Sequence, residues 1–346
     1  MKVALIGAGS WGTALAQTLA HAGNEVVMWA RKPQVASAIT QEHRNPRYLS
    51  DVRLDEAVSA THDLERCLTG AQAVVMVTPS RLMRDFAIRI HPFVSDDTPI
   101  VICSKGVEEN TSLLPIEVFD EVMGGLDRLA VLSGPNHAEE VITQVPTGTV
   151  IASRSDETAR FFRDLFTTSY FRCYVSSDYL GVEVCAAFKN VIAIAVGGAY
   201  GLGYGDNTAA MLMTRGMAEM GRLVLACGGD AMTVMGLAGA GDLIATCTSE
   251  HSRNRSFGKM LAQGGSLAAY EESTHMVVEG ALACRTICPL ADRYQVELPI
   301  AQVVRAIVWE NTPLREASEA LFNRPLTTEF WGFESNGDEG GTASRR

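Results

Sequence analysis

Short apolar segments alternate with stretches of helical composition along the first half of the chain. Such segments are typical of strands that are buried on both faces of a parallel sheet. We expect a helix over Trp11–His21, and strands at Lys2–Ile6, Glu25–Trp29, Ala73–Val77, Pro99–Cys103, Leu129–Leu132, Thr149–Ala152 and Phe171–Val175. Strand–helix alternation with right-handed crossovers predicts an α/β, doubly wound and mostly parallel sheet.

The pattern changes after Asp178. Long segments rich in Ala, Met and Leu then follow one another, which is typical of helices. We expect helices over Val182–Tyr200, Thr208–Ala226, Ser256–Gln263, Val277–Tyr294 and Ile300–Glu310. We therefore predict an α/β domain over residues 1–178, an all-α domain over 179–334, and a disordered tail over 335–346, where the sequence is polar and glycine-rich.

Composition and charge exclude several classes of protein. The 346 residues carry a formal net charge of −11, whereas a non-specific nucleic-acid binder needs a surplus of cations. No two of the eight cysteines have C-x-x-C spacing, and Cys284 and Cys288 lack histidines placed for a metal. We therefore predict no metal site and a reducing cytoplasm. No apolar run reaches the roughly 18 residues of a membrane span, so we expect no membrane insertion.

Three glycines near the N-terminus form a G-x-G-x-x-G motif at Gly7, Gly9 and Gly12. The motif follows the first predicted strand and opens a helix. The first glycine permits a tight turn, the second lets a pyrophosphate approach the backbone, and the third lets the helix pack on the strand. The motif predicts a dinucleotide site in a Rossmann-type domain; the alternative is a glycine turn without a ligand.

The end of the second predicted strand is basic, with Arg31 and Lys32 before Pro33. A site selective for NAD places Asp or Glu here, on the ribose 2′-hydroxyl, and an acid would repel a 2′-phosphate. The sequence therefore favours NADP(H), with NAD(H) also possible. The alternative is a solvated Arg-Lys pair at the start of a helix.

Two of the five lysines occupy positions that suggest chemistry. Lys189 lies in an apolar helical segment, where burial lowers the pKa of an ammonium and suits it to proton transfer. Lys105 follows a predicted strand, at the sheet edge where ligands of such folds bind. The alternative for Lys189 is a snorkelling or salt-bridged structural lysine. Asp242, in an uncharged segment, is either a helix N-cap or a partner that orients a lysine.

A small basic cluster follows at Ser252, Arg253 and Asn254. An arginine flanked by hydroxyl and amide donors is suited to hold a phosphate. The alternative is a charged, exposed loop.

These residues together resemble the cytoplasmic NAD(P)-dependent glycerol-3-phosphate dehydrogenases, over roughly residues 1–325. The matching segments are Gly7–Ala16, Ser104–Gly106, Ser133–Pro135, Phe188–Ile194, Gly239–Cys247, Ser252–Arg255 and Val277–Gly280. The resemblance implies a Rossmann-type domain followed by an all-α domain like that of 6-phosphogluconate dehydrogenase.

The resemblance also implies a role for each matching residue. In addition to Gly7, Gly9, Gly12 and Lys32, the expected cofactor-binding residues are Ser10, Trp11, Arg31, Lys105, Ala138, Arg253, Val277 and Glu279. The expected substrate-binding residues are Lys105, Gly134, Asn136, Lys189, Asp242, Thr246, Ser252, Arg253 and Asn254. Lys189 is the expected general acid and base, helped by Lys105 and Asp242. Asn136 departs from the family, which often has Thr or Ser there.

The expected activity is the reversible reduction of dihydroxyacetone phosphate to glycerol 3-phosphate, a precursor of glycerophospholipids. A small phosphorylated molecule is the expected partner, and a homodimer is left open. Two alternatives remain. One is another dehydrogenase of the same broad fold, acting on a 3-hydroxyacid or on 6-phosphogluconate. The other is a redox-sensing regulator that binds the dinucleotide without turnover, which would not need Lys189 in an apolar helix.

Overall fold

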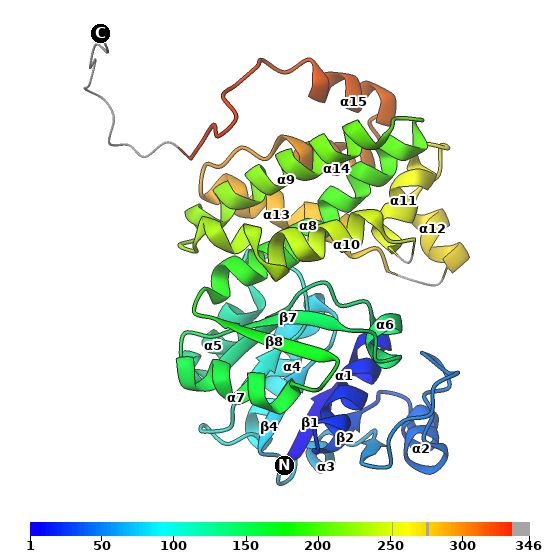
Figure 1. Ribbon diagram of the computed structural model, residues 1–346, viewed down its shortest axis with the longest axis vertical. Helices are drawn as coiled ribbons and strands as arrows, with labels where there is room; N and C mark the ends of the chain where they lie inside the picture. Colours follow the sequence, from blue (N-terminus) through cyan, green and yellow to red (C-terminus); the bar gives the residue numbers. More distant parts are fainter. Residues whose placement is uncertain (251, 275–276, 334–346) are drawn as a thin grey trace, which may run out of the picture.

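The computed structural model describes residues 1–250, 252–274 and 277–333, and the predicted tail lies outside them. A sheet covered by helices forms one half of the molecule, and helices alone form the other (Figure 1). The strands are β1 (Lys2–Ile6), β2 (Glu25–Trp29), β3 (Val58–Thr61), β4 (Ala73–Met76), β5 (Ile100–Ile102), β6 (Leu129–Ser133), β7 (Thr147–Ala152) and β8 (Phe171–Ser176). Their order in the sheet is β3-β2-β1-β4-β5-β6-β7-β8.

The first six strands of this order have the Rossmann arrangement, which confirms the predicted α/β domain. All neighbouring strands are parallel except β6 and β7, which are antiparallel. The helices of this half are α1 (Ser10–His21), α2 (Pro33–Glu42), α3 (Leu64–Leu68), α4 (Met83–Ile90), α5 (Pro115–Met123), α6 (Ala138–Ile142) and α7 (Asp156–Phe166).

The central strands are apolar throughout because both of their faces are covered. Successive side chains of a strand point to opposite faces. Val3 and Leu5 of β1 therefore join the core beneath α1, whereas Ala4 and Ile6 join the core that includes Phe86 of α4. The second of these cores continues into the helical half of the molecule, so the two halves share buried apolar contacts.

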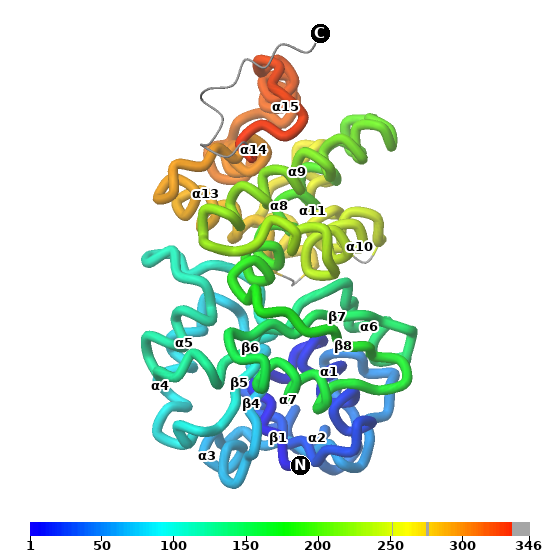
Figure 2. Tube along the Cα trace, turned by 60° about the vertical axis from the view of Figure 1, so that its left-hand side comes forward, coloured from blue at the N-terminus to red at the C-terminus, as the bar shows by residue number. Residues whose placement is uncertain are grey.

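The helical half is built around one long, buried helix, α8 (Tyr179–Gly201), which is seen surrounded by other helices in Figure 2. Those helices are α9 (Asp206–Ala226), α10 (Asp242–Thr248), α11 (Arg253–Leu261), α12 (Leu267–Thr274), α13 (Glu279–Arg293), α14 (Pro299–Trp309) and α15 (Leu314–Phe322). The predicted all-α character is confirmed. The predicted boundary at residue 178 lies between the end of β8 and the start of α8, and it remains a prediction.

Two glycines allow α8 and α11 to pack closely. A Cβ atom added to Gly197 would lie 2.1 Å from the carbonyl oxygen of Arg255, and one added to Gly258 would lie 2.2 Å from that of Ile194. Larger side chains at these positions would force the helices apart. The close contact brings the first turn of α11 beside the middle of α8, where Lys189 and its neighbour lie.

Helix α8 is the one helix among the described residues that is long and apolar enough to cross a membrane. It has 23 residues and a mean hydropathy of 1.7 over its most apolar window, so by length and composition it could cross a membrane. The sequence predicted a helix over Val182–Tyr200 but no membrane span, because Glu183 and Lys189 interrupt the apolar run. However, 89% of that window is buried inside the protein, and the core helix of a soluble protein passes the same test.

Candidate active site

The glycine-rich turn has the geometry that a bound dinucleotide requires. Gly7 has a φ of 127°, and a Cβ atom on it would lie 2.5 Å from the carbonyl oxygen of Val77. A Cβ atom on Gly12 would lie 1.9 Å from the carbonyl oxygen of Gly7, whereas one on Gly9 would meet no atom within 4 Å. Gly9 therefore leaves open space in front of the first turn of α1, which contains no acidic residue. The turn fits a pyrophosphate held by the helix N-terminus.

Two buried hydroxyl groups at the same edge of the sheet are also available to a ligand. Thr78 follows β4 and Ser133 ends β6, so both lie at the carboxyl ends of parallel strands. Within the described ranges, neither Thr78 Oγ1 nor Ser133 Oγ has a hydrogen-bond partner. Buried polar atoms are rarely left unpaired. Their position therefore fits a ligand bound across the sheet edge.

A second loop supports the glycine-rich turn. Asn45 is fully buried, and its Nδ2 donates to the carbonyl oxygen of Ala8 at 3.1 Å and to Thr13 Oγ1 at 2.8 Å. Its Oδ1 accepts from the backbone N–H groups of Arg47 and Tyr48. Sequence analysis missed Asn45, because the Asn-Pro pair at this position suggests no more than a turn.

The basic pair predicted to select the cofactor lies at the surface. Arg31 and Lys32 follow β2, and both are exposed. Lys32 is the N-cap residue of α2, and the first turn of α2 contains no acidic residue. The position therefore lacks the carboxylate of an NAD-selective site.

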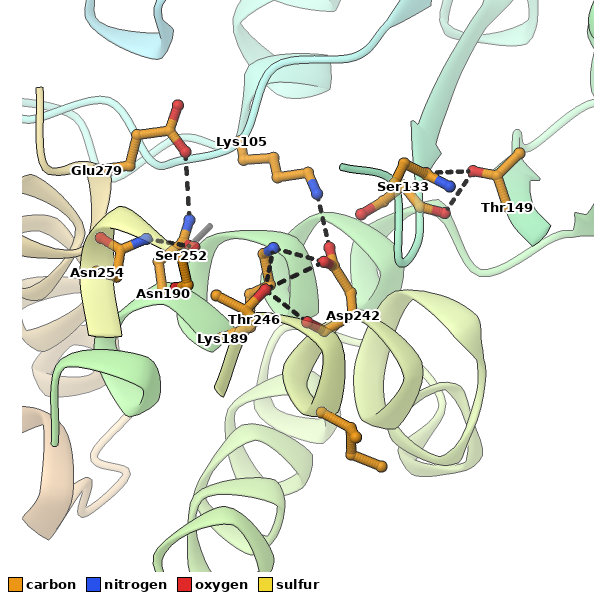
Figure 3. A network of polar contacts seen from close by, with 12 residues as sticks. Lys105, Ser133, Thr149, Lys189, Asn190, Asp242, Thr246, Ser252, Asn254 and Glu279 are labelled. Atoms are coloured by element: carbon orange, nitrogen blue, oxygen red, sulfur yellow. Dashed lines mark hydrogen bonds and ion pairs between the residues drawn. The ribbon is translucent and has the colours of Figure 1, made fainter. Parts of the chain in front are cut away.

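The predicted chemistry residues form one cluster between the two halves of the molecule (Figure 3). Lys189 of α8 donates from Nζ to Asp242 Oδ1 at 2.5 Å and to Thr246 Oγ1 at 2.7 Å. Lys105, in the loop after β5, donates from Nζ to Asp242 Oδ2 at 2.6 Å. One carboxylate therefore binds both lysines. Of the two predicted roles for Asp242, the lysine partner is correct, and the N-cap residue of α10 is Gly241.

Local backbone structure brings Asp242 to this point. A π-helical turn at Leu237–Gly241 leads directly into α10. A Cβ atom on Gly239 would lie 2.1 Å from the carbonyl oxygen of Val234, so the turn requires glycine there. Thr246 lies one turn after Asp242, and its hydroxyl donates to the carbonyl oxygen of Asp242 at 2.6 Å. That bond leaves its oxygen to accept from Lys189.

Burial and charge set the protonation of the cluster. Lys189 is only 7% exposed, and burial lowers its pKa to about 8, although Asp242 opposes this change. Burial alone would raise the pKa of Asp242, but the charges of Lys105 and Lys189 hold it below its ordinary value. The site therefore contains a carboxylate and a lysine that can change its charge near neutral pH. A lysine in this state can donate and accept a proton.

A second polar cluster lies beside the first, at the start of α11 and α13 (Figure 3). Asn254 donates from Nδ2 to Asn190 Oδ1 at 2.9 Å and accepts from the N–H of Gly280 at 2.9 Å. Asn190 donates to Glu279 Oε2 at 3.4 Å. Asn190 directly follows Lys189, and sequence analysis did not assign it to the site. The signal for it was a second polar residue in an otherwise apolar segment.

The residues of the predicted phosphate clamp differ in their surroundings. Ser252 is buried and caps α11, since its Oγ accepts from the N–H of Arg255 at 3.3 Å. Arg253 is exposed and donates to the carbonyl oxygen of Val277 at 3.2 Å. Arg253 therefore lies beside Val277, which is two residues before Glu279 in the sequence. The side chain of Ser252 also stabilises the helix on which Arg253 lies.

The predicted residues after β6 lie on the turn that leads to α6. Asn136 donates to the carbonyl oxygen of Gly148 at 3.1 Å, and its Oδ1 accepts from Thr149 Oγ1 at 3.0 Å. Its side chain thus connects the turn to β7. Gly134 is buried against the same strand, and Ala138 begins α6.

The comparisons with known proteins agree with this geometry. Residues 2–159 match the family described as NAD-dependent glycerol-3-phosphate dehydrogenase N-terminus, and residues 178–319 match its C-terminus. The chain belongs to the NAD-dependent glycerol-3-phosphate dehydrogenase family. The predicted family and its oxidoreductase activity on dihydroxyacetone phosphate are therefore confirmed, with NAD(P) as the cofactor.

Individual relatives cover almost the whole chain. The glycerol-3-phosphate dehydrogenase (NAD(P)+) of Nocardia farcinica is 45% identical over 335 residues, which are 95% of this chain and 99% of the relative. That of Moorella thermoacetica is 45% identical over 328 residues, which are 95% of this chain and 97% of the relative. The crystal structure of glycerol-3-phosphate dehydrogenase from Coxiella burnetii matches with a TM-score of 0.89 and 36% identity, covering 93% of this chain and 99% of that one.

The cysteines and potential metal ligands add nothing to the site. The eight cysteines are free, and no group of three or more His, Cys, Asp and Glu among the described residues could hold a metal ion.

Proposed function

We propose that Lys189 is the general acid and base of this dehydrogenase. The observation that carries the proposal is the contact of Lys189 Nζ with Asp242 and Thr246. These two hydrogen bonds hold a buried ammonium of lowered pKa in a fixed position. In the reductive direction Lys189 donates its proton to the alkoxide that forms on C2 of the substrate. In the oxidative direction the neutral amine takes the proton of the C2 hydroxyl.

The other members of the cluster support this proton transfer. The bound nicotinamide ring supplies or accepts the hydride. Asp242 keeps Lys189 oriented and favours its charged form, and Lys105 adds a second positive charge where negative charge develops on the substrate oxygen. Stabilisation of this kind acts on the transition state more than on the bound ketone.

The phosphate of the substrate is held by the start of α11 in this proposal. Arg253 supplies a guanidinium, and the first turn of α11 supplies backbone N–H groups and the positive end of the helix dipole. The hydrogen bond from Asn254 to Asn190 connects this helix start to α8, because Asn190 directly follows Lys189. The proposal therefore places the phosphate and the reacting carbon at fixed positions relative to each other, which supplies much of the rate.

Arg31 and Lys32 support a preference for NADPH over NADH, because two exposed cations can hold a 2′-phosphate. We further propose a cytoplasmic location and a role in supplying glycerol 3-phosphate for glycerophospholipids. Eight free cysteines support the reducing compartment. The homodimer stays a prediction.

The experiment that tests the acid is the consumption of reduced cofactor with dihydroxyacetone phosphate by the parent and by Lys189→Ala. General acid catalysis contributes about 100- to 10,000-fold, so we expect a loss of that size with unchanged affinity for NADPH. Lys259→Ala is the control, because Lys259 is an exposed lysine on α11. A single-turnover rate of Lys189→Ala within a few-fold of the parent would assign the proton transfer to another group.

A further inference from the structure

The loop that carries Lys105 ends at α5, and this segment of the first domain contacts the helical domain repeatedly. Among the residues that the structure describes, three polar contacts join the two: Lys105 with Asp242, Glu109 with Arg285 of α13, and the N–H of Ile116 with Glu183 of α8. Two of these six residues belong to the catalytic cluster. The Glu109–Arg285 pair is exposed on both sides, so it contributes little to the position of the loop.

The contact between Ile116 and Glu183 is of a different kind. Both carboxylate oxygens of Glu183 lie 3.2 Å from the backbone nitrogen of Ile116, and Glu183 is only 4% exposed. Ile116 is the second residue of α5, after Pro115, which has no N–H to offer. The N–H of Leu114 is already taken by Glu117 at 2.8 Å. Glu183 therefore satisfies a free donor of the first turn of α5 from another domain.

Glu183 and Lys189 lie on the same helix, roughly 9 Å apart along its axis at about 1.5 Å per residue. The loop that carries Lys105 is held at its start by Ser104, whose Oγ donates to the carbonyl oxygen of Thr78 at 2.5 Å. Its other end is the N-terminus of α5, where Ile116 meets Glu183. The helix that carries Lys189 thus fixes the far end of the loop that carries Lys105.

We propose that Glu183 is a positioning residue that sets the place of Lys105 relative to Lys189. The proposal rests on the assignment of both lysines to the active site, and it goes beyond that assignment because Glu183 contacts neither of them. Loss of its carboxylate frees the end of the loop, so that Lys105 reaches Asp242 and the substrate less often. The dinucleotide contacts that the glycine-rich turn supplies should change little, since that turn is on another loop.

The test is a double-mutant cycle of Glu183→Ala and Lys105→Ala, read as kcat/KM for dihydroxyacetone phosphate. We expect Glu183→Ala to lower kcat/KM by about tenfold in the parent and by less than about twofold in Lys105→Ala, because coupled residues are not additive. Glu183→Gln retains an acceptor oxygen for Ile116 and should restore most of the activity. Equal losses in both backgrounds would overturn the proposal.

Glu219 is a matched control for the stability effect. It is a buried glutamate on α9 that binds a helix N-terminus, with Oε1 2.7 Å from the nitrogen of Ile300 in α14, but both helices lie in the helical domain. We expect Glu219→Ala to lower the Tm as Glu183→Ala does and to change kcat/KM by less than twofold. An activity loss in Glu219→Ala equal to that of Glu183→Ala would make the effect a general one and refute the proposal.

Two further measurements keep the result clear. If Glu183→Ala does not fold, Glu183→Asp enters the same cycle, since its carboxylate is one methylene short of Ile116, and additivity there would equally overturn the proposal. The Lys189→Ala experiment tests the proton transfer separately. The cycle compares Lys105 backgrounds, so coupling between Glu183 and Lys105 can be observed whichever group supplies the proton.

Discussion

Lys105 and Asp242 are separated by 137 residues in the sequence, and their charged groups lie 2.6 Å apart. Lys105 comes from the dinucleotide-binding half of the molecule and Asp242 from the helical half. The same carboxylate also binds Lys189. Asp242 is therefore the point at which the two halves of the active site are joined, and two lysines share its single negative charge.

Replacing Asp242 with Asn should lower the rate and shift its pH dependence. The amide keeps the size of the side chain but removes the charge that favours the protonated form of Lys189. The pKa of Lys189, about 8 in the parent, should fall further. We expect the alkaline limb of kcat/KM for ketone reduction to move down by about 1–3 pH units. An unchanged pH profile would show that Asp242 does not act through Lys189. Asp206→Asn, at an exposed site, is the control.

The parent enzyme should show opposite pH dependences in the two directions. Reduction needs Lys189 protonated, so kcat/KM for the ketone falls as pH rises through about 8, the lowered pKa of Lys189. Oxidation needs the neutral amine, so kcat/KM for glycerol 3-phosphate rises through the same value. Initial rates in both directions over this range provide the measurement. Parallel profiles in the two directions would contradict the assignment of one residue to both steps.

Arg253→Ala should discriminate between phosphorylated and unphosphorylated ketones. Loss of a charge-assisted contact costs about 1.5–3 kcal/mol, so kcat/KM for dihydroxyacetone phosphate should fall roughly 10- to 150-fold. Dihydroxyacetone has no phosphate and should be affected much less. The exposed Lys259→Ala variant on the same helix controls for a general loss of positive charge. Similar losses on both ketones would remove Arg253 from the phosphate site.

Glu219→Gln should change how stability depends on pH. Burial raises the pKa of Glu219 from 4.5 to about 7 in the folded protein. Between these values the folded state binds more protons than the unfolded state, so this residue makes stability fall as pH rises from about 4.5 to about 7. The glutamine variant lacks that contribution. The Tm of the variant minus the Tm of the parent should therefore become more positive as pH rises across this range. A constant difference in Tm would show that Glu219 does not titrate there.

The dinucleotide site could be predicted because its signals are local. The glycines at Gly7, Gly9 and Gly12 follow a buried strand within one short segment, so the motif can be seen in the sequence alone. Lys189 was noticed because an ammonium in an apolar helix is costly. The short strand β3 was missed, since its sequence Val-Ser-Ala-Thr at the sheet edge is half polar and only partly buried.

Contacts between distant segments could not be predicted in this way. The sequence left two roles open for Asp242, and only its tertiary contact with Lys105 and Lys189 decides between them. Glu183 is noticeable in the sequence only as a charge in an apolar segment, and its partner could not be predicted because it is a backbone N–H that is 67 residues away. Asn45 likewise pairs with a backbone carbonyl. Backbone partners leave no trace in residue identity, so polar residues that bind them look like ordinary surface positions.

Arg31→Asp should shift the cofactor preference from NADPH toward NADH. Arg31 is exposed at the end of β2, where an acid would bind the 2′-hydroxyl of NAD and repel the 2′-phosphate of NADP. Each charge-assisted contact to the phosphate contributes about 1.5–3 kcal/mol, so kcat/KM for NADPH should fall roughly 10- to 150-fold while that for NADH stays level or rises. Lys32→Ala separates the second cation, and it should weaken NADPH use without favouring NADH. Since both cofactors carry the same nicotinamide, kcat with saturating cofactor should stay close to that of the parent. An unchanged ratio of the two efficiencies in Arg31→Asp would show that Arg31 is only a surface charge.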